Sequence, residues 1–150
     1  MPRAKSRRRK GRPRKKGDAA RSHADRLRKV LFEAQGVGLE LPQLIRACEL
    51  TRSQVRSGLA MLRDQCAEKG WPPIVWLLDG GYRFSGDPDL LRTYEIGEIH
   101  EHLVEIRRLM TGTVAPHATL HPADKWVAYL VTQLAAVEST LDLLVSSKTS

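Results

Sequence analysis

Between residues 22 and 70, apolar side chains recur every three or four positions among polar ones. Ser22, with Asp25 three residues later, is typical of a helix N-terminus, and Gly36 supplies a stop. Pro42 suits the first turn of a short second helix, because this turn does not need the amide hydrogen that proline lacks. The pattern predicts two helices before residue 50.

A capping box predicts a third helix over residues 52–69. Thr51 precedes Gln54 by three residues, so each side chain can bind the other residue's backbone amide. Four apolar side chains then fall within about 60° of one another on a helical wheel, with Gly58 at the margin. The expected inward residues are Val55, Leu59, Leu62 and Cys66.

The period of the pattern changes after Gly70. Residues 74–78 are β-branched, aromatic or leucine, and the run Asp79-Gly80-Gly81 is typical of a tight turn before residues 82–84. Three helices followed by a two-stranded hairpin are the order of a winged helix-turn-helix domain. We expect this domain over residues 21–86.

Residues 87–150 predict a helical hairpin. Asp87 and Pro88 suit the N-cap and first turn of a helix that continues to about Met110. Its apolar stripe steps by three or four residues through Ile96, Ile99, Leu103, Ile106 and Met110. The predicted fold class is therefore mainly α with a small β-hairpin.

The second arm of this hairpin is expected to begin at His121-Pro122. Gly112 and Pro116 predict that residues 111–120 form the loop between the arms. The stripe of the second arm runs through Val127, Leu130, Leu134, Val137, Leu141 and Leu144. Two such stripes need a partner surface. We favour a homodimer through these C-terminal helices, and an antiparallel pair within one chain satisfies the same pattern.

Positive charge is concentrated at the N-terminus. Residues 1–17 hold ten Lys or Arg and no acid, and residues 1–30 hold fourteen with only two acids, a net charge of +12. The whole chain has 25 basic and 17 acidic residues, which leaves 11 and 15, a net charge of −4, for residues 31–150. We expect residues 1–20 to be a disordered tail that binds a polyanion.

The centre of this tail resembles an AT-hook. A short Gly-Arg-Pro core between basic residues is thin enough to enter the minor groove of A·T-rich DNA, which is about 6 Å wide. A nonspecific arm that binds phosphates has the same composition. The candidate DNA contacts here are Arg9, Lys10, Gly11, Arg12, Pro13, Arg14 and Lys15.

The predicted third helix supplies a second set of candidate DNA contacts. The second helix of a helix-turn-helix motif enters the major groove, where Arg can read guanine and Gln can read adenine. The candidates that avoid the apolar stripe are Arg52, Ser53, Gln54, Arg56 and Ser57. Arg63, two turns further on, is a candidate phosphate contact, and Arg83 in the hairpin is a candidate contact to a phosphate or to the minor groove. A solvated helix face has the same composition, and Gln54 can be occupied by the capping box.

Other chemistry is poorly supported by the sequence. The histidines and the acids have no spacing typical of metal ligands, and no phosphate-binding loop or nucleophile motif occurs, so we expect neither a metal nor a cofactor nor enzyme activity. We interpret Cys48 and Cys66 as reduced core residues and Trp76 and Trp126 as core anchors. No apolar run approaches the roughly 18 residues that span a bilayer, so we expect a cytoplasmic, nucleoid-associated protein without a membrane.

Three stretches resemble the actinobacterial RacP-type proteins encoded near integrating mobile elements. They are SQVRSGLAMLRDQCAEKGWPPIVW at residues 53–76, GYRFSGDPDLL at 81–91 and RRLMTGTVAPHATLHPADKWV at 107–127. The resemblance implies a DNA-binding or regulatory role. Together with the helix-turn-helix pattern, it leads us to expect sequence-specific binding of double-stranded DNA by a transcriptional regulator. The alternative is a winged helix used as a protein-docking module in replication or transfer of a mobile element.

Overall fold

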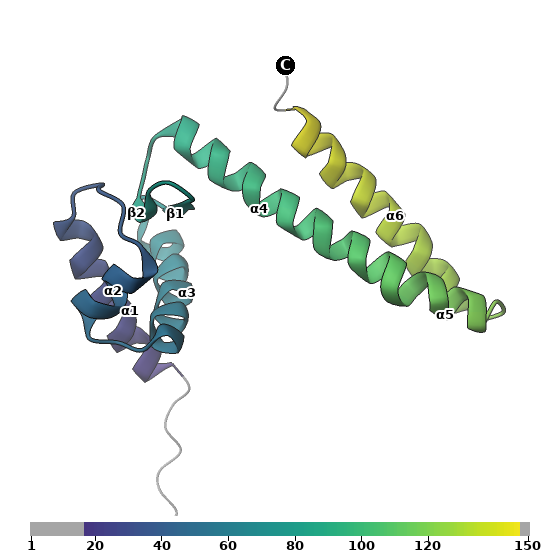
Figure 1. Ribbon diagram of the computed structural model, residues 1–150, viewed down its shortest axis with the longest axis horizontal. Helices are drawn as coiled ribbons and strands as arrows, with labels where there is room; N and C mark the ends of the chain where they lie inside the picture. Colours follow the sequence, from purple (N-terminus) through teal and green to yellow (C-terminus); the bar gives the residue numbers. More distant parts are fainter. Residues whose placement is uncertain (1–16, 148–150) are drawn as a thin grey trace, which may run out of the picture. The chain divides into compact units, whose positions relative to one another are not determined.

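The computed structural model describes residues 17–147, which divide into two compact units between Phe84 and Ser85. The first unit consists of α1, α2 and α3 followed by a hairpin of β1 and β2, and the second is a helical hairpin built mainly of α4 and α6 (Figure 1). The coarse fold class is confirmed, because the described chain is mainly helical with one small antiparallel β-hairpin.

The first helix, α1 (Asp18–Glu33), begins four residues before the expected start at Ser22. Gly17 precedes it with φ of 125°, and no side chain caps this end. The expectation of a Ser22 cap was wrong because Asp18 offers a negative charge to the helix N-terminus and the two alanines after it are strong helix formers. The helix therefore gains one further turn, which includes residues 18–20.

The second and third helices follow the predicted pattern closely. In α2 (Leu41–Cys48), Pro42 lies in the first turn, and Glu40 forms a capping box with Gln43. In α3 (Arg52–Lys69), the predicted box is confirmed: Thr51 Oγ1 accepts from the Gln54 amide at 3.2 Å, and Gln54 Oε1 accepts from the Thr51 amide at 2.9 Å. The start of α3 is thereby fixed by two reciprocal hydrogen bonds.

The hairpin pairs β1 (Ile74–Leu77) with β2 (Gly81–Phe84) in antiparallel register, with Val75 opposite Arg83. The loop between α1 and α2 adds a short third pairing. Leu39 and Tyr82 exchange two backbone hydrogen bonds of 2.9 and 2.8 Å. This bridge fastens the hairpin to the segment that leads into α2.

The core of the first unit lies between α1, α2 and α3. The expected inward face of α3 is confirmed, since Val55, Leu59, Leu62 and Cys66 are buried, as is Gly58. These side chains pack with Ala24, Leu27, Leu31, Leu44, Cys48, Leu50 and Ile74. Both cysteines are free thiols, and burial raises their pKa values. They are core residues, as expected.

The second unit begins with α4 (Pro88–Leu109), which Asp87 caps by accepting a hydrogen bond of 2.9 Å from the Asp89 amide. The expected loop over residues 111–120 was wrong. A π-helical turn, η1 (Met110–Val114), and α5 (Ala115–Leu120) continue the helix instead. Pro116 lies in the first turn of α5, after the wider π turn has shifted the hydrogen-bond register, so its missing amide hydrogen does not end the helix.

The last helix, α6 (Lys125–Ser146), starts four residues after the expected His121. Asp124 is the N-cap, and its Oδ1 accepts a hydrogen bond of 2.8 Å from the amide of Trp126. A carboxylate is a much stronger N-cap than histidine, which explains the later start. Within this unit α6 returns along α4, as Figure 1 shows for the green and yellow helices.

Candidate nucleic-acid interface

Most of the candidate DNA contacts on α3 lie outside its buried stripe. Arg52, Ser53, Arg56, Ser57 and Arg63 are all exposed. The helix therefore divides cleanly into a buried apolar side and an exposed polar side, as an amphipathic surface helix does.

The three arginines share one flank of α3. Arg52, Arg56 and Arg63 fall within about 40° of one another on a helical wheel, and we call this set the arginine flank. None of the three forms a hydrogen bond or an ion pair with another residue in the described part of the chain. Their guanidinium groups are therefore available to an external anion.

The residues that point most directly away from the core are small. Ser53, Ser57 and Ala60 are exposed there, followed by the acidic Asp64 one turn later. Short side chains allow a helix backbone to approach a surface closely, while the neighbouring arginines are long enough to reach beyond it. The N-terminal half of α3 can thus approach a polyanion more closely than the half that contains Asp64.

Two of the nominated polar side chains already have partners. Gln54 is half-buried, and its Oε1 is the acceptor of the capping box. The Ser57 hydroxyl donates a hydrogen bond of 3.1 Å to the carbonyl of Gln54. Gln54 is therefore a structural residue of the helix start, as its position in the box had suggested, whereas the Ser57 oxygen keeps its capacity as an acceptor.

Arg83 does not project freely from the β-hairpin. Its side chain is half-buried and folds back over the turn, so that a Cβ atom added at Gly80 would collide with the Arg83 guanidinium. Its Nε is buried without a hydrogen-bond partner. The hairpin turn is also tight against Gly38, where an added Cβ would collide with the Gly80 carbonyl. Arg83 thus packs on the turn of the hairpin.

Several further basic residues of the first unit were not nominated from the sequence. Arg46 is exposed on α2, in the helix that precedes α3. Arg28 and Lys69 lie over the ring of Trp71, at 5.4 and 4.9 Å from its centroid, and have a local cation–π partner. The signal that could have found Arg46 is its place in the helix before α3, since the corresponding helix of helix-turn-helix proteins crosses the DNA backbone.

The remaining nominated residues are those of the N-terminal tail. Arg9, Lys10, Gly11, Arg12, Pro13, Arg14 and Lys15 lie outside the described residues. The hypothesis that they contact DNA depends on the sequence alone.

The histidines of the second unit form local pairs. His117 Nε2 lies 3.2 Å from Asp124 Oδ2, and the His117 and His121 rings are 5.6 Å apart. Hydrogen bonding from the Trp126 amide lowers the pKa of Asp124, and His117 adds to this effect. Within residues 17–147, no three His, Cys, Asp or Glu side chains are grouped closely enough to hold a metal ion.

One helix is more apolar than the sequence pattern suggested. By length and composition alone, α6 could cross a membrane, with a mean hydropathy of 1.3 over its most apolar window, of which 6 % is buried. This corrects the expectation that no segment approaches that length. A helix that is apolar on most sides is also typical of one that packs against several neighbours.

Comparison with protein-family models, with curated protein sequences and with solved structures finds no match to this chain. The resemblance to RacP-type proteins therefore stays a prediction.

Proposed function

We propose that the protein binds double-stranded DNA as a winged helix-turn-helix transcriptional regulator. The arginine flank of α3 is the observation that carries this proposal. Three unpaired guanidinium groups beside a row of small residues suit a helix that enters the major groove, where arginine reads guanine with two hydrogen bonds.

The arrangement around α3 supports the same proposal. In this proposal α2 and α3 are the two helices of the motif and the hairpin of β1 and β2 is the wing, and the isolated bridge between Leu39 and Tyr82 joins the wing to the loop before α2. In this proposal Arg56 and Ser53 face base edges, while Arg52 and Arg63 bind phosphates on either side. Arg46 on α2 would be a further phosphate contact, and Arg83 supports the wing turn.

The basic tail supplies affinity in this proposal. Ten positive charges within residues 1–17 can neutralise several phosphates, each of which contributes about 0.9 to the slope of log K against log salt. The Gly-Arg-Pro core at residues 11–13 would add a preference for A·T-rich minor grooves. The tail would hold the protein on the nucleoid, and α3 would select the site.

A dimer completes the proposal. Two copies joined through their C-terminal helices would present two copies of α3 to two half-sites, which multiplies specificity. This arrangement is the usual one for DNA-reading helix-turn-helix proteins.

The test is a selection of bound duplexes from a random pool, performed with the full chain and with a variant that lacks residues 1–17. We expect both proteins to enrich the same sequence, and we expect the deletion to weaken binding to every duplex and to flatten its salt dependence. An unchanged salt slope would show that the tail does not contact DNA. If the truncated protein enriches nothing, the DNA-reading role of α3 is wrong and the alternative, a protein-docking module, is favoured.

A further inference from the structure

The α4–α6 hairpin has very little core of its own. Leu103, Val114 and Val127 are its only described apolar residues that are buried, although its two arms carry eleven apolar residues at heptad-like spacing. Several large apolar side chains of the unit are exposed instead: Leu109, Leu120, Trp126, Tyr129, Val131, Val137, Leu143 and Leu144. The expectation that Trp126 is a core anchor was wrong, since 60 % of it is exposed, and the same expectation was wrong for Trp76 of the first unit, which is 38 % exposed.

The two flanks of α6 differ in chemistry. Trp126, Leu130, Val137 and Leu144 fall within about 40° of one another on a helical wheel, and we call this side the open flank. On the other side Arg107 of α4 donates from Nε to Glu138 at 2.8 Å and from Nη2 to Asp142 at 3.0 Å. Glu138 lies about 80° or more round the helix from the residues of the open flank, and Asp142 lies about 120° or more from them. Ion pairs therefore close one side of the hairpin, and the other side stays apolar.

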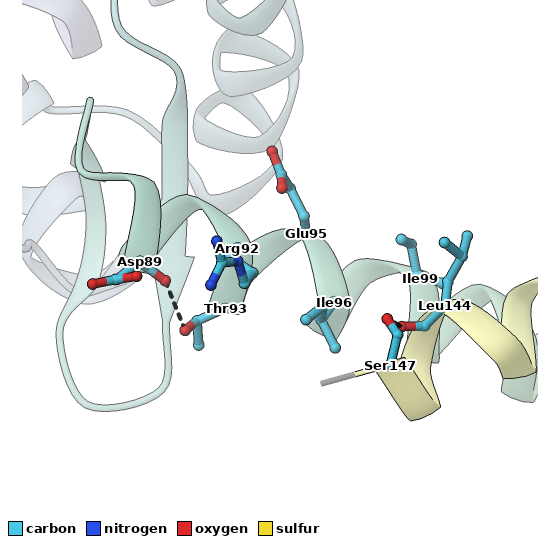
Figure 2. A pocket seen from close by; sticks show the side chains of 8 residues that line it. All are labelled: Asp89, Arg92, Thr93, Glu95, Ile96, Ile99, Leu144 and Ser147. Atoms are coloured by element: carbon cyan, nitrogen blue, oxygen red, sulfur yellow. Dashed lines mark hydrogen bonds between the residues drawn. The ribbon is translucent and has the colours of Figure 1, made fainter. Parts of the chain in front are cut away.

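The open flank continues to the end of the hairpin. Figure 2 shows Leu144 beside Ile99 where α6 ends against α4, in a groove that Ile96 also lines. Its other lining side chains are polar: Asp89, Arg92, Thr93, Glu95 and Ser147. The apolar surface thus runs from Trp126 at one end of α6 to this groove at the other.

We propose that the open flank of one chain packs against the open flank of a second copy, so that two hairpins form a four-helix bundle. This inference rests on the dimer of the proposed function and assigns it one face. The 22-residue α6 is about 33 Å long and the two helices together are about 20 Å across, so the side of the hairpin that includes the open flank and the adjoining part of α4 covers about 660 Å². This is close to the ~800 Å² that each partner buries in a standard interface.

The distribution of charge favours a second copy of the chain as the partner, with the two α6 helices at the centre of the interface. The open flank of α6 carries no charged residue, because Gln133 and Thr140 are the polar residues beside its apolar side chains. Two identical flanks can therefore meet without like charges opposite one another. Glu98, Glu101 and Glu105 lie on the side of α4 away from its apolar stripe, and a contact between two copies of α4 through that side would bring these charges together.

The steps of the repeat suit helix pairing as well. Trp126, Leu130, Gln133, Val137, Thr140 and Leu144 follow one another at four, three, four, three and four residues. This spacing of 3.5 residues keeps one seam facing a partner helix along its whole length. The polar positions Gln133 and Thr140 alternate with apolar ones and would fix the register of the pair.

The experiment measures the mass of the full chain by sedimentation equilibrium, for the wild type and two charge variants of α6. We expect twice the 16.9 kDa of one chain for the wild type. Val137→Asp places an unpaired charge in the open flank and should raise the dimer Kd at least about 100-fold. Ser139→Asp places the same charge on the exposed opposite side and should leave the Kd within about threefold.

Val137→Thr is a second test variant in case Val137→Asp does not fold, because threonine has nearly the shape of valine. It should weaken the dimer with unchanged helical circular dichroism. A monomeric wild type would overturn the proposal, as would a Ser139→Asp variant that dissociates as readily as Val137→Asp. Flotation of a monomer with neutral phosphatidylcholine vesicles would assign the open flank to lipid and would also overturn it. A monomeric wild type that still binds the selected duplex in preference to others would contradict the dimer and would support the DNA-binding proposal.

Discussion

Gly58 in α3 lies directly against Leu27 in α1: a Cβ atom added at Gly58 would stand 2.6 Å from Cδ1 of Leu27. Leu27 is fully buried, so its side chain has little room to move away. This close approach holds α3 at a fixed distance from α1. The orientation of the arginine flank therefore depends on a glycine on the other side of the same helix.

Gly58→Val should destabilise the first unit. Three added carbon atoms overpack a closed core, which costs about 1 to 3 kcal/mol. Chemical denaturation monitored by circular dichroism measures the loss, and Ala67→Val, an enlargement at an exposed position of α3, is the matched control. If both variants unfold at the same denaturant concentration, the close packing of α1 on α3 is not as described.

Thr51→Ala should weaken the start of α3. The substitution removes the oxygen that accepts from the Gln54 amide, and loss of such a cap costs about 1 kcal/mol. Thr51→Ser keeps the hydroxyl and should retain most of the stability. Thermal unfolding of the two variants side by side checks this, and an equal fall in Tm for both would contradict the capping role.

Stability of the helical hairpin should fall in acid through Asp124. The pKa of this carboxylate is lowered in the folded state, chiefly because it accepts a hydrogen bond from the Trp126 amide. The ionised Asp124 side chain therefore makes its full contribution to the free energy of unfolding above the ordinary aspartate pKa, near pH 4. This contribution is lost as the pH falls through the lowered pKa of the folded state.

The Asp124→Asn variant distinguishes the effect of the negative charge on stability from the effect of the N-cap hydrogen bond. Asparagine also caps helices well but does not titrate, so the variant should be less stable than the wild type at pH 7 and should depend less on pH below about 4. Denaturation midpoints from pH 2 to 7 measure the difference. The control is Asp64→Asn, at an exposed acid of the first unit. Parallel pH profiles for the wild type and Asp124→Asn would contradict the prediction.

Local signals predicted much of the first unit correctly. The Thr51–Gln54 box, the inward stripe of α3 and the turn before Gly81 are each encoded within a few residues, so the sequence pattern was sufficient. The pairing of Leu39 with Tyr82 joins residues 43 positions apart, and no local pattern reports it.

The second unit shows where such reasoning fails. Gly112 and Pro116 usually end helices, but the π turn before Pro116 moves the hydrogen-bond register so that the helix continues. A heptad stripe likewise does not reveal which of its residues are covered. Leu103 is buried and Val137 is exposed, although both belong to the predicted apolar stripes.

The candidate site was predicted from residue types and helix phase, which explains its mixed outcome. The angular position of each residue around the helix axis correctly predicted that Arg52, Arg56 and Arg63 are exposed on α3. It could not show that the Arg83 side chain folds over its own turn, because that conformation depends on the close approach of Gly80.

The most direct measurement compares binding of a selected duplex with binding of a scrambled duplex at one salt concentration. Arg56→Ala should reduce the preference about tenfold to a hundredfold, because one good arginine–base contact contributes about 1 to 3 kcal/mol of discrimination. Arg108→Ala removes an exposed arginine from the second unit and should leave the preference unchanged. A wild type without preference, or an Arg56→Ala variant that keeps all of it, would contradict the proposal that α3 reads DNA.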